Sequence, residues 1–372
     1  MSIRRALVPL TLILLFSAAV VLSAVPPPPA GLNKALEAFR TFYAKGMAET
    51  GIVGGSVLLL HDNQILDKAH FGMANQEKSQ PADDHTIYHW ASNTKTMTGV
   101  AIMQLRDRGL LELDDPIVKY IPELKQVYNP FDDMADITIR PLLTHSAGFR
   151  DATWPWKDKP WQPFEPRRWE QLMAMFPYTE IEFKPGSRRS YSNPGIIFLG
   201  RTIELLAGDD YEVYIDKNIL KPLEMYESYF WKRDILTAAP FDADTGITVS
   251  NGGLNSSIAD FAKYLDFLMG NPKKQAVSEG ILKRSSLEEM FKPAIKIESE
   301  TPVEPGLDSV EESQGLIFFV EKHLGTTTIA NRGHQNGFVS HFYLQPDSRT
   351  AYVVAYNTYA TAKSGTPQGA SG

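Results

Sequence analysis

Segments that read as β-strands lie at both ends of this 372-residue chain, and segments that read as helices fill its middle. Apolar and β-branched residues predict two strands, at 53–60 and 65–71, around a turn at 61–64. Further strands are predicted near the other end, at 315–320, 326–330, 338–344 and 351–356. The two ends of the chain would therefore form one sheet, and the middle of the chain would be inserted between its strands in the sequence.

Helical apolar spacing occurs before the first strand and through the middle of the chain. The helices are predicted at 32–47, 170–176, 195–207, 211–220 and 260–269. This order of elements favours an α+β fold, with an antiparallel β-sheet flanked by helices and made from about 50–75 and 240–358. An inserted all-helical subdomain is predicted over about 91–240, and the cleft between the two parts is the expected place for a site.

The N-terminal segment is typical of an export signal. Arg4 and Arg5 precede the apolar run 6–21, and small residues follow at 22–24. We therefore expect a signal peptide over 1–24, a proline-rich linker over 25–31, a folded domain over 32–358 and a flexible tail over 359–372. The predicted location is periplasmic or secreted, with an uncleaved signal segment as the alternative and the expected route to any membrane contact.

Composition narrows the function. The chain is 43% hydrophobic and 22% charged, which is ordinary for a globular protein, and it has no cysteine for disulfides or thiolate metal sites. The formal charge of −7 and the absence of a basic stripe argue against nucleic acid as a partner. No nucleotide-binding or zinc-protease motif occurs, so we expect no cofactor and no metal.

Two short motifs about 100 residues apart carry candidate chemistry. Ser92 opens a Ser-Asn-Thr-Lys sequence, and an apolar helical stretch follows it. If Ser92 begins that helix, Lys95 lies one turn on and on the same face, where it could take the proton of the serine hydroxyl. Tyr191 and Asn193 form the second motif, Tyr-Ser-Asn, and alternate residues of an extended segment point the same way. The plainer alternative is that Ser92 only caps a helix and Lys95 is solvated.

With these motifs the chain resembles the serine β-lactamase and penicillin-binding protein superfamily, in its class C-like branch. The similarity runs from about 33 to 358. The stretches that carry it are 91–95, 109–116, 138–149, 185–186, 191–193 and 251–254. The resemblance implies that Ser92 is the acylated nucleophile, that Lys95 helps to deprotonate it, and that Tyr191 is a general base or a proton relay. Asn193 would hold a substrate amide, and the Ser92 N–H with one N–H from a strand would form the oxyanion hole.

The family's third motif is Lys or His, a small residue and Gly on a strand edge, and three places in this chain compete for it. Asn331, Arg332 and Gly333 have the expected place, although Asn stands where a cation is usual. His334 supplies a histidine three residues further on, and the literal match, Lys363-Ser364-Gly365, lies in the tail. We favour the first alternative, so Asn193, Asn331, Arg332, Gly333 and His334 are the predicted substrate-binding residues.

The predicted function is that of an exported serine hydrolase that forms an acyl-enzyme on Ser92. The substrate is expected to be a small molecule or peptide: an ester, a D-amino-acid peptide, a peptidoglycan stem peptide or a β-lactam. The departure at Asn331 ranks ester or peptide hydrolysis above β-lactam hydrolysis. The alternatives are a non-catalytic binding module with the penicillin-recognising fold and a serine acyl-transferase, and the oligomeric state stays open.

The family also usually closes its sheet with a final helix. The tail from 358 onward is rich in small residues and does not predict one. One face of the sheet is therefore expected to be uncovered or to be covered by another part of the protein.

Overall fold

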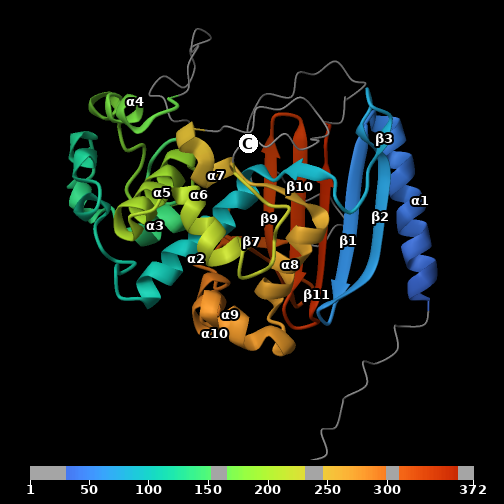
Figure 1. Cartoon of the computed structure of the whole chain (residues 1–372). Coiled ribbons are helices and arrows are strands. Elements are labelled where there is room, and N and C mark those ends of the chain that lie inside the picture. Colours follow the sequence, from blue (N-terminus) through green and yellow to red (C-terminus); the bar gives the residue numbers. More distant parts are fainter. Residues whose placement is uncertain (1–30, 152–165, 231–245, 299–309, 359–372) are drawn as a thin grey trace, which may run out of the picture.

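A computed structural model describes residues 31–151, 166–230, 246–298 and 310–358 (Figure 1). The predicted signal segment 1–24, the linker up to residue 30, and the tail with Lys363-Ser364-Gly365 lie outside the described residues.

One antiparallel sheet joins the two ends of the chain. Its strand order is β3-β2-β1-β11-β10-β9-β8-β7-β6, so β1 from the N-terminal part pairs with β11 from the C-terminal part (Figure 1). The strands are β1 Gly54–His61, β2 Gln64–Asn75, β3 Gln80–Pro81, β6 Ile295–Lys296, β7 Glu311–Gln314, β8 Phe319–His323, β9 Thr326–Gln335, β10 Phe338–Gln345 and β11 Thr350–Tyr356. Two short strands, β4 Ile87–His89 and β5 Asn255–Ser257, pair separately. The α+β prediction, with a sheet made from both chain ends, is confirmed.

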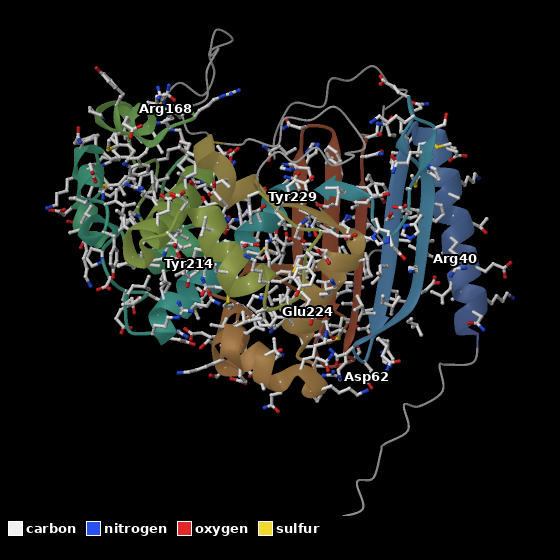
Figure 2. All side chains as sticks on the ribbon, viewed as in Figure 1. Arg40, Asp62, Arg168, Tyr214, Glu224 and Tyr229 are labelled. Atoms are coloured by element: carbon white, nitrogen blue, oxygen red, sulfur yellow. The ribbon has the colours of Figure 1, made fainter. Side chains whose placement is uncertain are left out.

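The turn between β1 and β2 has the predicted position and a clear local cause. Asp62 and Asn63 have φ of 51° and 64°, the left-handed conformation that a two-residue hairpin turn needs and that Asp and Asn tolerate. Arg349 from the β10–β11 connection donates to both residues and to the Gly270 carbonyl, so this corner of the sheet is closed by side chains; Asp62 is marked in Figure 2.

The strand predicted at 315–320 is misplaced. β7 ends at Gln314 and β8 begins at Phe319, and the residues between them form a turn. Leu316, Ile317 and Phe318 are all buried in that turn. An apolar run can be buried as a packed turn as well as in a strand, and hydrophobicity alone does not separate the two.

The helices that follow β4 pack on one face of the sheet and beside the side of the sheet that strands β9 to β6 form (Figure 1). They are α2 Thr94–Asp107, α3 Ile139–Leu143, α4 Trp169–Met173, α5 Asn193–Ala207, α6 Tyr211–Ile215, α7 Val249–Gly252, α8 Ile258–Met269, α9 Gln275–Ile281 and α10 Arg284–Met290. Helix α2 is central, because every residue from Thr94 to Leu105 is buried. Gly208, with φ of 69°, ends α5 as a glycine C-cap.

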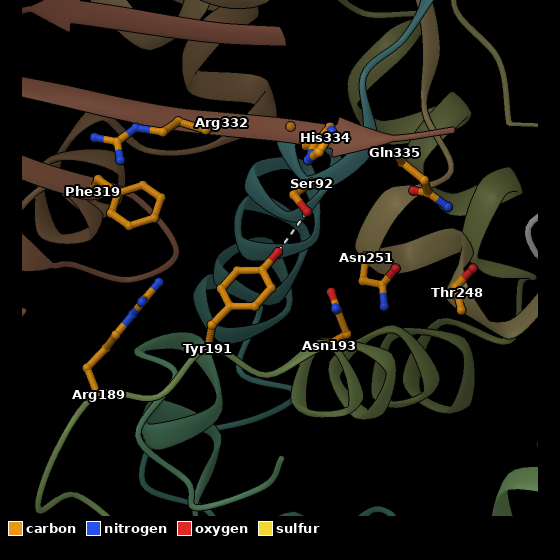
Figure 3. A pocket seen from close by; sticks show the side chains of 11 residues that line it. Ser92, Arg189, Tyr191, Asn193, Thr248, Asn251, Phe319, Arg332, His334 and Gln335 are labelled. Carbon is orange, nitrogen blue, oxygen red and sulfur yellow. Dashed lines mark hydrogen bonds between the residues drawn. The ribbon is translucent and has the colours of Figure 1, made fainter. Parts of the chain in front are cut away.

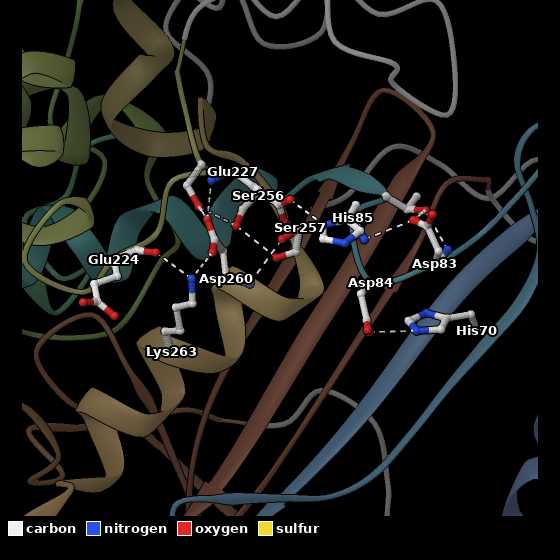
Figure 4. Close-up of polar contacts among 12 residues, drawn as sticks. His70, Asp83, Asp84, His85, Glu224, Glu227, Ser256, Ser257, Asp260 and Lys263 are labelled. Atoms are coloured by element: carbon white, nitrogen blue, oxygen red, sulfur yellow. Dashed lines mark hydrogen bonds and ion pairs between the residues drawn. The ribbon is translucent and has the colours of Figure 1, made fainter. Parts of the chain in front are cut away.

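The buried carboxylate of Asp260 links α8 to residues 227–228. Asp260 accepts hydrogen bonds from the Glu227 N–H at 2.6 Å and the Ser228 hydroxyl at 3.0 Å, and Lys263 donates to its other oxygen at 2.7 Å (Figure 4). The Ser257 hydroxyl in turn accepts from the Asp260 N–H and caps the helix. Strand β5 leads directly into α8 and pairs with β4, and β4 leads into the Ser92 segment.

Among the described helices, α1, Leu32–Thr50, is the one that lies on the opposite face of the sheet (Figure 1). Tyr43 contacts the rings of Phe71 and Tyr356 at centroid distances of 4.9 and 5.6 Å, and Met47 is buried beside them. Arg40, marked in Figure 2, pairs with Asp67 of β2. A groove of about 370 Å³ remains beside α1, with Leu36, Phe39, Val57, Tyr352 and Val354 among its lining residues, so the described residues cover this face only in part.

Across the described segments, no helix combines the length and apolar character needed to cross a membrane.

Candidate active site

Ser92 lies in a short 3-10 turn, Ala91–Asn93, that leads directly into α2. Trp90, the residue before this turn, is fixed by two contacts. Its ring stacks on Phe261 at a centroid distance of 3.7 Å, and its indole N–H donates to the Ser256 carbonyl at 2.9 Å. Ala91 has φ of 46°, a conformation that a residue with a Cβ adopts at a cost. The surrounding packing therefore imposes the backbone bend that presents Ser92.

Lys95 is completely buried directly behind the Ser92 hydroxyl. Its Nζ donates to Ser92 Oγ at 2.9 Å and to the Asn251 carbonyl at 2.8 Å. Burial lowers the pKa of Lys95 to about 7, against a smaller opposing effect of Asp151. Near neutral pH a large fraction of the side chain is therefore an uncharged amine that can accept a proton.

Tyr191 contacts Ser92 from the other side. Its hydroxyl lies 2.7 Å from Ser92 Oγ (Figure 3). The Lys95 Nζ lies 4.9 Å from the centre of the Tyr191 ring. Burial raises the pKa of Tyr191 well above its ordinary value, while the hydrogen bond from Ser92 opposes that shift. The phenol is thus protonated at neutral pH, which suits it to donate a proton, whereas Lys95 is the better acceptor.

His145 forms hydrogen bonds with the residues on both sides of Tyr191, and the sequence did not predict these contacts. Its carbonyl accepts from the Ser190 N–H at 2.8 Å, and its Nδ1 accepts from the Ser192 N–H at 3.2 Å. The rings of His145 and Tyr191 lie 4.7 Å apart. Burial, with the charges of Arg189 and Lys95, lowers the pKa of His145 well below its usual value, so the ring is neutral with its proton on Nε2. No local sequence pattern connects His145 with Ser192, because 47 residues separate them.

Asn193 faces the pocket beside Tyr191 (Figure 3). It is the first residue of α5, which Ser192 caps by accepting a hydrogen bond from the Gly195 N–H. The Asn193 amide donates to Asp151 Oδ1 at 3.1 Å, so the orientation of the amide is fixed by a residue that the motif does not include.

The pocket around Ser92 has a volume of about 530 Å³. Thr248 and Asn251 lie toward one end, and Phe319 with two arginines forms the other (Figure 3). The lining residues are Ser92, Arg189, Tyr191, Asn193, Thr248, Asn251, Phe319, Arg332, Gly333, His334 and Gln335. The predicted residues Ser92, Tyr191, Asn193, Arg332, Gly333 and His334 are thus brought together, and Arg189 and Phe319 are additions from the structure.

Within the third motif, the need for glycine at position 333 has a clear steric cause. A Cβ there would lie 2.1 Å from the Trp90 carbonyl oxygen, so only glycine lets β9 approach the Ser92 turn this closely. The Asn93 amide donates to Ser340 Oγ at 2.8 Å and fixes the same approach from β10.

The other residues of the third motif differ in what they present to the pocket. Asn331 is buried outside the pocket lining, and its side-chain oxygen accepts from the Arg332 N–H at 2.7 Å. Arg332 is held by Glu312 and Glu321. His334 lines the pocket, and partial burial lowers its pKa, so it is largely uncharged at neutral pH. The substrate-binding assignments of Asn331, Arg332 and His334 stay predictions.

The edge of β9 next to Ser92 carries no strand partner within the described chain. β8 pairs with β9 as far as Ala330, and residues 331–335 pair only with β10. Residues 332–335 of this unpaired edge line the pocket, where their backbone groups can meet an extended substrate. The predicted oxyanion hole, from the Ser92 N–H and this strand, stays a prediction.

For metal binding, the described residues offer no group of three histidine, aspartate or glutamate side chains close enough to hold an ion.

Comparison with known proteins identifies relatives of this arrangement. The Beta-lactamase family model matches residues 39–370. Protein flp of Staphylococcus aureus (strain COL) is 29% identical over 199 residues, which cover 53% of this chain and 39% of that protein. This chain therefore spans well under two thirds of the length of that relative.

Solved structures share the fold. The octameric penicillin-binding protein homologue from Pyrococcus abyssi superposes with a TM-score of 0.74 and 28% identity, over 87% of this chain and 74% of that one. A class C beta-lactamase superposes with a TM-score of 0.69 and 19% identity, over 88% of this chain and 92% of that one, a likeness of fold alone.

Proposed function

The chain belongs to the Beta-lactamase family, whose model matches most of its length, and from that premise we propose that it is a serine hydrolase with Ser92 as nucleophile. One observation supports this above all others: Ser92 Oγ lies within hydrogen-bonding distance of both Lys95 Nζ, at 2.9 Å, and Tyr191 Oη, at 2.7 Å. A serine hydroxyl placed between a neutral amine and a phenol has both a proton acceptor and a proton donor.

The chemistry follows from the two pKa shifts. Ser92 Oγ attacks the carbonyl carbon of the substrate while its proton passes to the uncharged amine of Lys95. Backbone N–H groups of the Ser92 turn and the β9 edge would stabilise the oxyanion. Tyr191 donates its proton to the leaving oxygen or nitrogen as that bond breaks, and the ammonium group of Lys95 returns the proton taken from Ser92 to the Tyr191 phenolate, so both groups regain their starting protonation states. Water then hydrolyses the acyl-enzyme by the reverse proton transfers.

The proposed substrates are esters or amides in extended, peptide-like form, ranked above β-lactams. Supporting this order, the unpaired β9 edge can bind a substrate backbone, and the third motif offers Asn331, buried outside the pocket lining, where the family usually has a cation. The proposed location is periplasmic or secreted. N-terminal sequencing of the protein recovered from a bacterial host's exported fraction would test it, with a mature start near residue 25 expected and a start at Met1 counting against it.

The test of the nucleophile is intact-mass measurement after incubation with a fluorophosphonate, for the wild type and for Ser92→Ala. We expect one adduct on the wild type and none on the variant, followed by turnover of p-nitrophenyl esters. The same experiment with a penicillin gives a lifetime for any adduct. Absence of the fluorophosphonate adduct would reject the proposal and favour a non-catalytic binding module.

A further inference from the structure

The end of the pocket formed by Phe319 holds two guanidinium groups around one aromatic ring. Arg189 lies 5.4 Å and Arg332 5.1 Å from the centre of the Phe319 ring. In Figure 3, Arg332 extends from β9 and Arg189 rises from the loop that leads to Tyr191, with Phe319 between them. This end adjoins the reacting hydroxyl, because Arg189 also lies 5.5 Å from the ring of Tyr191.

The two arginines differ in what balances their charge. Arg332 Nη2 contacts the carboxylates of both Glu312 and Glu321. Two negative charges therefore surround the single positive charge of Arg332. Arg332 and His334 were the cations that the sequence offered for substrate binding, and these ion pairs direct Arg332 toward β7 and β8.

Arg189 has no such partner among the described residues. None of them forms a salt bridge or hydrogen bond with its guanidinium, and its Nε is buried without a hydrogen-bond partner. Glu312 and Asp151 act on it only from a distance, and Arg332 repels it. Contact with the rings of Tyr191 and Phe319 satisfies none of its N–H donors. A half-buried guanidinium in this state is a preformed site for an anion.

We propose that Arg189 binds a carboxylate of the substrate, so that the enzyme selects esters or amides that carry a free carboxylate near the scissile bond. This inference rests on the proposed function for its chemistry, whereas the binding that it describes does not depend on catalysis. The planar fork of the guanidinium matches a carboxylate with two parallel hydrogen bonds, and Phe319 offers an apolar surface beside it. The position is unusual in that the cation comes from the Tyr191 loop and not from β9.

The test is calorimetric titration of the Ser92→Ala protein with hippurate and with hippuramide, which share a skeleton and differ in the carboxylate. We expect hippurate to bind at least about tenfold more tightly than hippuramide. Arg189→Gln should reduce that ratio to near one, and Arg189→Lys should keep part of it. Arg188→Gln is the matched control, because Arg188 is the exposed neighbour and lies over Phe183 outside the pocket.

The outcomes separate this inference from the proposed function. Equal binding of the two ligands, no detectable binding of hippurate, or a ratio unchanged in Arg189→Gln would overturn the role of Arg189, even if Ser92 is labelled by a fluorophosphonate. Charge-selective binding that depends on Arg189, together with an unlabelled Ser92, would support the anion site and reject the hydrolase. A thermal midpoint of Arg189→Gln equal to that of the Ser92→Ala parent would show that a changed ratio does not reflect unfolding.

Discussion

Lys95 meets two opposing demands at the scale of single residues. Its burial behind Ser92 makes it a proton acceptor near pH 7, and the same burial disfavours its charged form in the folded protein. Activity and stability should therefore respond in opposite directions when this side chain is changed.

The first prediction concerns pH. For an uncharged ester, kcat/KM should rise as pH increases through about 7, because Lys95 is a protonated ammonium below its pKa and an accepting amine above it. Initial rates from pH 5 to 9 would measure this profile. A rate that is flat over this range, with the fold intact at every pH, would assign the acceptor role to a different group.

The second prediction concerns stability. The folded pKa of Lys95 is lowered, so between about 7 and 10.5 the unfolded chain binds a proton that the folded chain does not, and the free energy of unfolding rises with pH across this window. Lys95→Met should abolish turnover and raise the free energy of unfolding at pH 7, with about 5 kcal/mol as the upper limit from 1.36 kcal/mol per pKa unit.

Urea denaturation at pH 7 would check this change in stability. Lys45→Met is the control, since Lys45 is 72% exposed and should leave both properties nearly unchanged. A Lys95→Met protein that is less stable than the wild type would show that the hydrogen bond to the Asn251 carbonyl outweighs the buried charge.

Among the elements, the close approach of β9 to the Ser92 turn decides the geometry of the site. Gly333 allows the approach, and Asn93 with Ser340 holds it. The Trp90 carbonyl that Gly333 meets is itself fixed by the stacking of Trp90 on Phe261, so neither side can yield easily.

The third prediction is that Gly333→Ala destabilises the fold by about 1–3 kcal/mol and lowers kcat, because an added methyl would lie 2.1 Å from the Trp90 oxygen. Gly280→Ala is its control: that glycine lies in α9 with open space around it, and alanine there should be neutral or stabilise by up to about 1 kcal/mol. Thermal unfolding and ester turnover of both variants would measure this. Equal behaviour of the two variants would mean that β9 can move away from the turn.

At the scale of the whole molecule, α1 is attached to the face of the sheet opposite the site. Its described contacts are few, chiefly Tyr43, Met47 and the Arg40–Asp67 pair, while Phe42 on the same helix is 76% exposed. A helix held this lightly should open locally without disturbing Ser92.

The fourth prediction is that Tyr43→Ala speeds amide hydrogen exchange in Leu32–Thr50 by about tenfold or more and leaves ester turnover within about twofold, because the lost ring packs only between α1 and the sheet. Phe42→Ala should change neither property. Exchange measured by mass spectrometry would locate the effect, and loss of turnover in Tyr43→Ala would show that α1 is coupled to the site across the sheet.

Much of this protein follows from local sequence. The Asp62-Asn63 turn, the Gly208 helix stop and the Ser257 helix start are each decided by the conformational preference of one or two residues. The order of strands and helices predicts the α+β sheet made from both chain ends. The Ser92–Lys95 spacing places a potential base one turn from the nucleophile, and that contact is present at 2.9 Å.

The rest depends on contacts between residues that are far apart in the chain, which no local pattern encodes. Burial from many elements sets the pKa of Lys95 and of Tyr191, and it turns the apolar run at 316–318 into a packed turn. His145 reaches the Tyr191 loop across 47 residues. The sequence suggests Arg332 or His334 as the binding cation, but only the fold brings Glu312 and Glu321 onto Arg332 and leaves Arg189 facing the pocket. Charge balance and desolvation are sums over all neighbours, so the tertiary structure alone decides them.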